Sequence, residues 1–157
     1  FDAGFVGGSC CSRLSAFTKI GKVEYSTVDE DYAVLTTFDR LGDQFGYMGA
    51  RTYDSSWDDG PLWRTIGYPG DVSSGMRPVY ERDFHLDEDE FDLGEGRAMT
   101  CGADLMKGHS GGPIFGFWPA GPYVVAVVSA AGDDDNNYCA GGSWLPKLVG
   151  EARAVDP

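Results

Sequence analysis

Short apolar runs separated by glycine, proline and acidic residues dominate the pattern of this chain. β-branched and aromatic residues recur in runs of strand length, which is typical of β-structure rather than helix. We therefore predict strands over the segments 31–38, 62–68, 77–85, 98–101, 113–118 and 123–129. Strands at such short, regular spacing predict an all-β fold built as a barrel.

The segments between these runs carry turn signals or a different periodicity. Residues 119–122 hold two prolines and a glycine, so the runs on either side are predicted to form a hairpin. Residues 41–49 have the pattern of a linker, and the acidic stretch 84–93 that of a solvated hairpin. Apolar positions within 145–155 lie near helical spacing and predict a short C-terminal helix.

Composition and charge exclude several classes of protein. The 157 residues, 42% of them hydrophobic, suffice for about one domain with a real core. The net charge of −13 would repel phosphates, so we expect no nucleic-acid partner. The longest apolar runs are far shorter than the roughly 18 residues of a membrane span, so we expect no membrane insertion. With two histidines and no Cys-x-x-Cys pair, no metal site or cofactor is expected.

The four cysteines favour disulfides in a secreted protein. Three pairings of the four are possible. We favour the pair Cys101 and Cys139. This disulfide would link the segment before residues 108–113 with the region after strand 123–129. Adjacent cysteines seldom bond to each other, because the geometry is strained. Cys10 and Cys11 are therefore candidates for a disulfide to another chain.

The hexapeptide Gly108–Pro113 has the composition of a nucleophile loop. A serine hydroxyl needs an adjacent base and a tight turn that exposes its oxygen. Flanking glycines permit such a turn and let backbone amides converge beside the hydroxyl, where they would stabilise an acyl oxyanion. The predicted nucleophile is Ser110, and the predicted oxyanion donors are the N–H groups of Gly108 and Ser110. The alternative is an ordinary Gly/Ser turn.

At these residues the chain resembles the chymotrypsin-like serine peptidases, whose signature is Gly-x-Ser-Gly-Gly-Pro. Residues 31–35 are similar to the Asp-x-Ala-x-Leu segment that carries the triad carboxylate of that class. Their order with Leu41-Gly42, Gly46-Tyr47 and the turn 67–71 resembles the glutamyl-endopeptidase (V8-like) branch over residues 31–118. The resemblance implies a double β-barrel in which Asp31 orients a catalytic histidine. The alternative for Asp31 is a strand-entry cap or a solvated acid.

The catalytic histidine is missing from its expected place. The family carries it before the aspartate, but residues 1–30 contain no histidine. His109 is expected to point away from Ser110, and His85 lies in the acidic stretch. We therefore expect residues 1–45 to form part of the N-terminal barrel and residues 46–157 a complete C-terminal barrel with the terminal helix. A separate N-terminal chain of the same precursor would supply the histidine, with Cys10 or Cys11 available to link it.

The resemblance also suggests where substrate would bind. Asp104 would take the place of the pocket-floor acid of trypsin-like enzymes, and the pocket wall would be formed by Val128, Ser129, Ala130 and Gly132. An acid on the floor favours Arg or Lys before the scissile bond. The V8-like branch prefers Glu and uses a histidine on the wall strand, where this chain offers none. The alternative for Asp104 is a solvated loop acid.

Two functions from different classes follow. The first is a secreted serine endopeptidase that acts on peptide or protein substrates. The second is a non-catalytic homologue that serves as a binding module. The acidic runs 87–90 and 133–135 lack the spacing of a calcium loop, so we interpret them as solvated faces.

Overall fold

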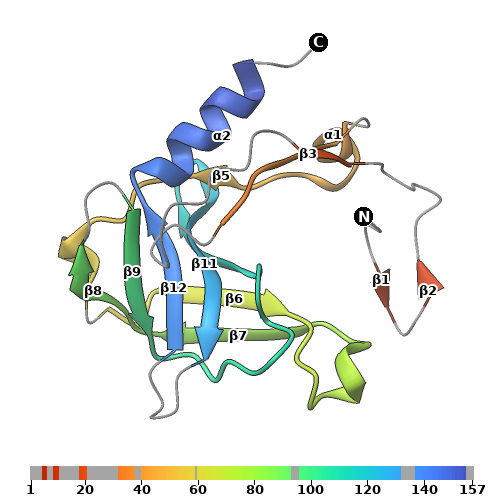
Figure 1. Ribbon diagram of the computed structural model, residues 1–157, viewed down its shortest axis with the longest axis horizontal. Helices are drawn as coiled ribbons and strands as arrows, with labels where there is room; N and C mark the ends of the chain where they lie inside the picture. Colours follow the sequence, from red (N-terminus) through yellow and green to blue (C-terminus); the bar gives the residue numbers. More distant parts are fainter. Residues whose placement is uncertain are drawn as a thin grey trace.

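A large β-sheet forms the body of the molecule in the computed structural model (Figure 1). The structure describes residues 5–6, 9–10, 18–20, 32–37, 40–58, 60–92, 96–131 and 137–154. The strand order of the main sheet is β7-β6-β10-β11-β12-β9-β8, all antiparallel, and β5 pairs in parallel with β11. The strands of this sheet are β5 (Gly49–Ala50), β6 (Trp63–Gly67), β7 (Val79–Phe84), β8 (Leu86–Asp92), β9 (Gly96–Cys101), β10 (Pro113–Trp118), β11 (Gly121–Ala131) and β12 (Asn137–Gly142).

The remaining elements are small, apart from the last helix. Two two-stranded sheets pair β1 with β2 and β3 with β4. No helix among the described residues has the length and apolar character needed to cross a lipid bilayer. The elements outside the main sheet are β1 (Phe5–Val6), β2 (Ser9–Cys10), β3 (Thr18–Ile20), β4 (Leu35–Thr37), α1 (Leu41–Phe45), the 3₁₀ turns η2 (Ser55–Trp57) and η3 (Ser73–Gly75), and α2 (Trp144–Ala154).

The two outermost strands of the main sheet are consecutive in the chain. β7 ends at Phe84 and β8 begins at Leu86, so only His85 separates them. β7 pairs with β6 at one end of the strand order, and β8 pairs with β9 at the other. In Figure 1, β6 and β7 run crosswise to β9, β12 and β11. The sheet is thus strongly bent, and its two ends are joined through His85.

The core lies on the inner face of this sheet. Leu86, Ile114 and Val125 are fully buried, and they come from three different strands. β6 buries alternate residues, as expected for a strand with one face toward the interior. Burial of such side chains supplies most of the stabilising free energy of a small domain.

An aromatic cluster fastens the segment before β6 to the sheet. The rings of Tyr53 and Trp118 each contact those of Trp57 and Trp63, which also contact each other, with centroid separations between 5.3 and 6.2 Å. The Arg51 guanidinium lies 4.9 Å from the Trp118 ring centroid, at cation–π distance. The buried Tyr53 hydroxyl also hydrogen-bonds to the Leu86 carbonyl at 2.7 Å.

Each of the six predicted strand segments contains a strand, and three other predictions are corrected. The strands lie within 31–38, 62–68, 77–85 and 113–118, over 98–101 and in the region of 123–129, and the hairpin between 113–118 and 123–129 is present. The predicted solvated hairpin at 84–93 is instead mostly the strand β8, and the predicted linker 41–49 contains the short helix α1. The C-terminal helix is confirmed, but it begins at Trp144, one residue before the predicted segment 145–155.

Truncation of a core side chain provides a first test of the packing. We expect Ile114→Val to lower the free energy of unfolding by about 0.5–1.5 kcal/mol, because Ile114 is fully buried and the lost methyl group leaves a void. Ile66→Val is the matched control, since Ile66 is 39% exposed, and it should change stability by less than about 0.5 kcal/mol. Urea denaturation followed by circular dichroism measures both. Equal losses would contradict the assignment of Ile114 to the core.

Candidate active site

The loop 106–112, which we call the nucleophile loop, consists of two consecutive tight turns that share His109. The N–H of His109 donates to the carbonyl of Met106 at 3.0 Å, which closes the first turn. The N–H of Gly112 donates to the carbonyl of His109 at 2.8 Å, which closes the second. Ser110 follows the shared residue and is exposed. Its hydroxyl is therefore carried on a short, doubly closed loop and is open to solvent.

Glycine occupies the third position of both turns. Gly108 has φ +107° and Gly111 has φ +82°, in the left-handed region that other residues adopt only at a cost. A Cβ added to Gly108 would lie 2.3 Å from the carbonyl oxygen of Tyr68, whereas one added to Gly111 would meet nothing within 4 Å. Gly108 is thus required by both dihedral angle and space, but Gly111 by dihedral angle alone.

The two predicted oxyanion donors are unused. Among the described residues, the N–H groups of Gly108 and Ser110 donate to no other backbone group, although those of His109, Gly111 and Gly112 all do. Backbone donors left free beside an exposed hydroxyl are the components an oxyanion hole needs. The arrangement leaves them available to a ligand oxygen.

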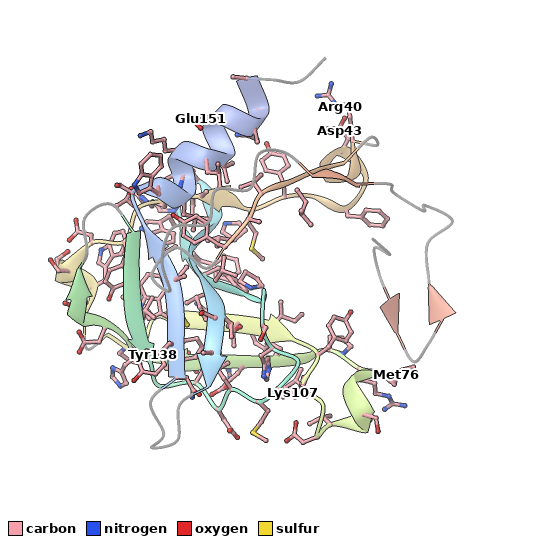
Figure 2. The ribbon with its side chains drawn as sticks, in the orientation of Figure 1. Arg40, Asp43, Met76, Lys107, Tyr138 and Glu151 are labelled. Atoms are coloured by element: carbon pink, nitrogen blue, oxygen red, sulfur yellow. The ribbon has the colours of Figure 1, made fainter. Side chains whose placement is uncertain are left out.

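The nucleophile loop is fixed to its surroundings on two sides. Gly111 donates to the Val128 carbonyl, and the Val128 N–H donates to the Gly112 carbonyl, both at 2.9 Å. On the other side, the N–H of Gly70 donates to the Lys107 carbonyl at 2.7 Å. Figure 2 shows Lys107 at the margin of the sheet, on the side from which the loop bearing Met76 projects. These bonds tie the loop to β11 and to the turn that follows β6.

The residues predicted to form the pocket wall lie where β11 leaves its partner β10. The β10–β11 pairing begins at Pro113, opposite Val127, and the nucleophile loop bonds to Val128. Beyond Val128, the described strands pair with β11 only through β12. Ser129 is partly exposed and Ala130 is exposed. Gly132, the last predicted wall residue, lies outside the described residues.

Asp104, the predicted pocket-floor acid, is exposed between two buried neighbours. Ala103 and Leu105 are 2% and 4% exposed and anchor this segment in the core. The Asp104 N–H donates to both carboxylate oxygens of Glu81, at 3.0 and 3.1 Å. Two acidic residues distant in sequence therefore meet on the segment that leads into the nucleophile loop.

The structure brings no histidine to Ser110 within its described part. His109 is 3% exposed; its Nδ1 accepts from the Met106 N–H, and its Nε2 has no hydrogen-bond partner. His85 is exposed at the junction of β7 and β8, where its carbonyl accepts from the Gly102 N–H. Asp31, the predicted triad carboxylate, lies outside the described residues.

Cys101 and Cys139 lie on adjacent strands and are both free, buried thiols. Their mutual hydrogen bond lowers the pKa of Cys101 and, together with burial, raises the pKa of Cys139 well above its usual value. The structure therefore brings the predicted pair into contact in the reduced form. Cys10 lies in β2, and Cys11 lies outside the described residues.

We expect these two thiols to form a disulfide when the protein folds under oxidising conditions. Because the partners are already in contact, the bond requires little rearrangement of β9 and β12. Peptide mapping without reduction should recover the fragments containing Cys101 and Cys139 as one linked species. Cys139→Ser should abolish that species. Recovery of Cys101 linked instead to Cys10 or Cys11 would contradict the predicted pairing.

Two residues that the sequence did not single out help to shape the site. Asn137 is 7% exposed, and its amide donates to the Ala103 carbonyl at 2.6 Å, which holds the approach to the nucleophile loop. The Glu81 carboxylate accepts from the backbone N–H of Asp104, in the same segment before the nucleophile loop. Both lie far from the loop in sequence and carry no motif, so only the sheet pairing reveals them.

The described residues contain no group of three or more side chains placed to hold a metal ion. The acidic run 133–135 and the side chains of 88–90 lie outside the described part.

A scan against models of protein families finds no match for this sequence, and a search of curated proteins finds no relative.

Proposed function

We propose that this chain is the nucleophile-bearing part of a secreted, chymotrypsin-like serine endopeptidase. The observation that carries the proposal is the nucleophile loop itself. An exposed Ser110 lies in the second of two consecutive glycine-containing turns, and the amides of Gly108 and Ser110 have no backbone partner among the described residues. This loop geometry agrees with the Gly-x-Ser-Gly-Gly-Pro resemblance.

The proposed reaction forms an acyl-enzyme on Ser110. The Ser110 oxygen attacks the substrate carbonyl while a histidine takes the hydroxyl proton, and Asp31 orients that histidine. The amides of Gly108 and Ser110 donate to the resulting oxyanion. The histidine then returns the proton to the leaving amine, and water releases the acyl group by the reverse sequence. In this proposal the histidine comes from a separate N-terminal chain of the same precursor.

The course of the main sheet supports the proposed architecture. The two end strands of this open sheet, β7 and β8, are consecutive in the chain, which supports closure of the sheet into a barrel. The proposal assigns residues 46–157 to this C-terminal barrel and residues 1–45 to part of a second one. The exposed apolar side chains of Phe45 and Tyr47, 56% and 74% accessible, are compatible with a covering partner at this boundary.

Substrate would add as an extended strand to β11. The pairing of β10 with β11 ends at Val127, opposite Pro113, and Ala130 farther along β11 is exposed. Backbone pairing at such an edge aligns a peptide without regard to its sequence. Asp104 and Glu81 place two negative charges on the segment before the nucleophile loop, which favours Arg or Lys before the scissile bond, and the wall strand provides no histidine.

Labelling with a fluorophosphonate tests the proposal. In the assembled protein, with its N-terminal chain present, we expect stoichiometric modification of Ser110, located by mass spectrometry of the labelled peptide. Intact mass with and without reduction should also reveal the second polypeptide. Absence of label on Ser110 in an assembly of verified composition would contradict the proposed peptidase function and favour the non-catalytic binding module.

Peptide substrates with Arg or Glu before the scissile bond, assayed side by side, test the specificity. We propose faster cleavage after Arg, with the advantage reduced by Glu81→Gln or Asp104→Asn. Preference for Glu would instead place this chain with the V8-like enzymes in specificity.

A further inference from the structure

His109 joins the two turns of the nucleophile loop through its backbone and has a buried side chain, although it is next to the exposed Ser110. Its N–H closes the first turn of the nucleophile loop and its carbonyl closes the second, so its backbone joins the two. Its side chain is 3% exposed, in contrast to the exposed Ser110 beside it. An ionisable ring buried directly beneath a nucleophile loop calls for a structural reason, since burial of a polar group is costly unless it is hydrogen-bonded.

The ring makes one specific hydrogen bond. Its Nδ1 accepts from the backbone N–H of Met106 at 3.1 Å. An imidazole nitrogen that accepts cannot carry a proton, so the ring is neutral and its proton is on Nε2. Met106 and His109 thus bond reciprocally: the backbone of His109 donates to Met106, and its ring accepts from Met106. The first turn is closed twice, once through backbone and once through the side chain.

β6 provides a space shaped for this ring. A Cβ on Gly67 would lie 2.3 Å from Cδ2 of His109, so the ring packs directly on the bare backbone of Gly67. Thr65, two residues earlier and on the same face of β6, is also fully buried, and its hydroxyl has no hydrogen-bond partner. The ring is therefore held by contact with the strand on one side and by the Met106 amide on the other.

We infer that His109 is a positioning residue for the oxyanion hole. Its neutral ring fixes the first turn through Met106 and thereby sets the direction of the Gly108 and Ser110 amides. This inference rests on the proposed peptidase function, which it deepens. His109 neither contacts substrate nor takes the proton of Ser110, because its Nδ1 is occupied and its Nε2 is buried, with no partner in the part of the chain that the structure describes.

A matched pair of variants separates the hydrogen bond from simple filling of space. His109→Phe keeps a ring against Gly67 but removes the acceptor for the Met106 amide. His109→Asn loses ring volume but keeps an oxygen near the place of Nδ1. We expect the Phe variant to lose on the order of 10- to 100-fold in kcat, with little change in KM, because the oxyanion bonds act in the transition state. The Asn variant should retain most of the wild-type kcat. Equal losses in both variants, or a loss confined to KM, would overturn the inference.

A spectroscopic measurement tests the ring without any need for activity. Nitrogen NMR of the ¹⁵N-histidine-labelled wild-type chain should show His109 with a bare Nδ1 and a protonated Nε2 at neutral pH. The chain has two histidines, so His85→Gln identifies the signals of His109. A protonated Nδ1 would overturn the inference even if the enzyme were active. Conversely, absence of peptidase activity together with a bare Nδ1 would refute the proposed function while the ring geometry stood.

Discussion

Replacement of Ser110 with alanine is expected, under the proposed function, to lower kcat for peptide hydrolysis by a factor on the order of 10⁶, as removal of the nucleophile does in serine peptidases. The exposed Ser110 side chain makes no packing contribution that the structure requires. The free energy of unfolding should therefore change by less than about 0.5 kcal/mol. Steady-state kinetics on the assembled protein and a denaturation curve measure the two quantities.

Ser55→Ala is the appropriate control, because Ser55 is an exposed serine of η2 outside the nucleophile loop. It should leave both kcat and fluorophosphonate labelling unchanged. If Ser110→Ala hydrolyses peptides within tenfold of the wild-type rate, Ser110 is not the nucleophile and the proposed acyl-enzyme mechanism is wrong.

Gly108→Ala is expected to lower kcat by about 10²–10³, the usual effect of losing one oxyanion donor. The new methyl group would lie 2.3 Å from the Tyr68 carbonyl oxygen, and this oxygen belongs to backbone that cannot rotate away. The φ of +107° adds further strain. The first turn must therefore shift, and the N–H of residue 108 leaves its present direction.

Gly111→Ala provides the matched control for this prediction. Gly111 has φ +82° but open space around its Cα, so its substitution introduces conformational strain of about 1–2 kcal/mol without a clash. We expect a loss of stability with a much smaller loss of kcat. If Gly108→Ala and Gly111→Ala lower kcat equally, the clash with the Tyr68 carbonyl oxygen does not determine the direction of the N–H of residue 108.

The fold could be predicted where the hydrophobic pattern and the turn signals agree. Strand β6 and the β10–β11 hairpin were predicted because apolar, β-branched residues alternate or cluster there between clear breakers. Strand β8 was not, because acidic residues are rare in strands and local propensity favoured a hairpin. Its pairing with β9 is a long-range interaction that no local pattern encodes.

The candidate site also has parts that the sequence predicts and parts that depend on contacts between distant segments. Ser110 and its flanking glycines could be predicted because one contiguous motif specifies the turn, the exposed oxygen and the donors. The contact of Glu81 with the Asp104 amide joins segments 23 residues apart, and only the sheet brings them together. The contact of the His109 ring with Gly67 likewise depends on how closely β6 approaches the loop.

The aromatic cluster at the start of β6 gives the molecule an intrinsic optical reporter. Three of the four tryptophans in the chain, Trp57, Trp63 and Trp118, belong to this cluster and lie within 6.2 Å of one another, centroid to centroid. Excitation energy absorbed by one indole will be shared among the three, so their fluorescence reports on the sheet as a unit. Since none of them belongs to the nucleophile loop, emission can distinguish global unfolding from a local rearrangement around Ser110.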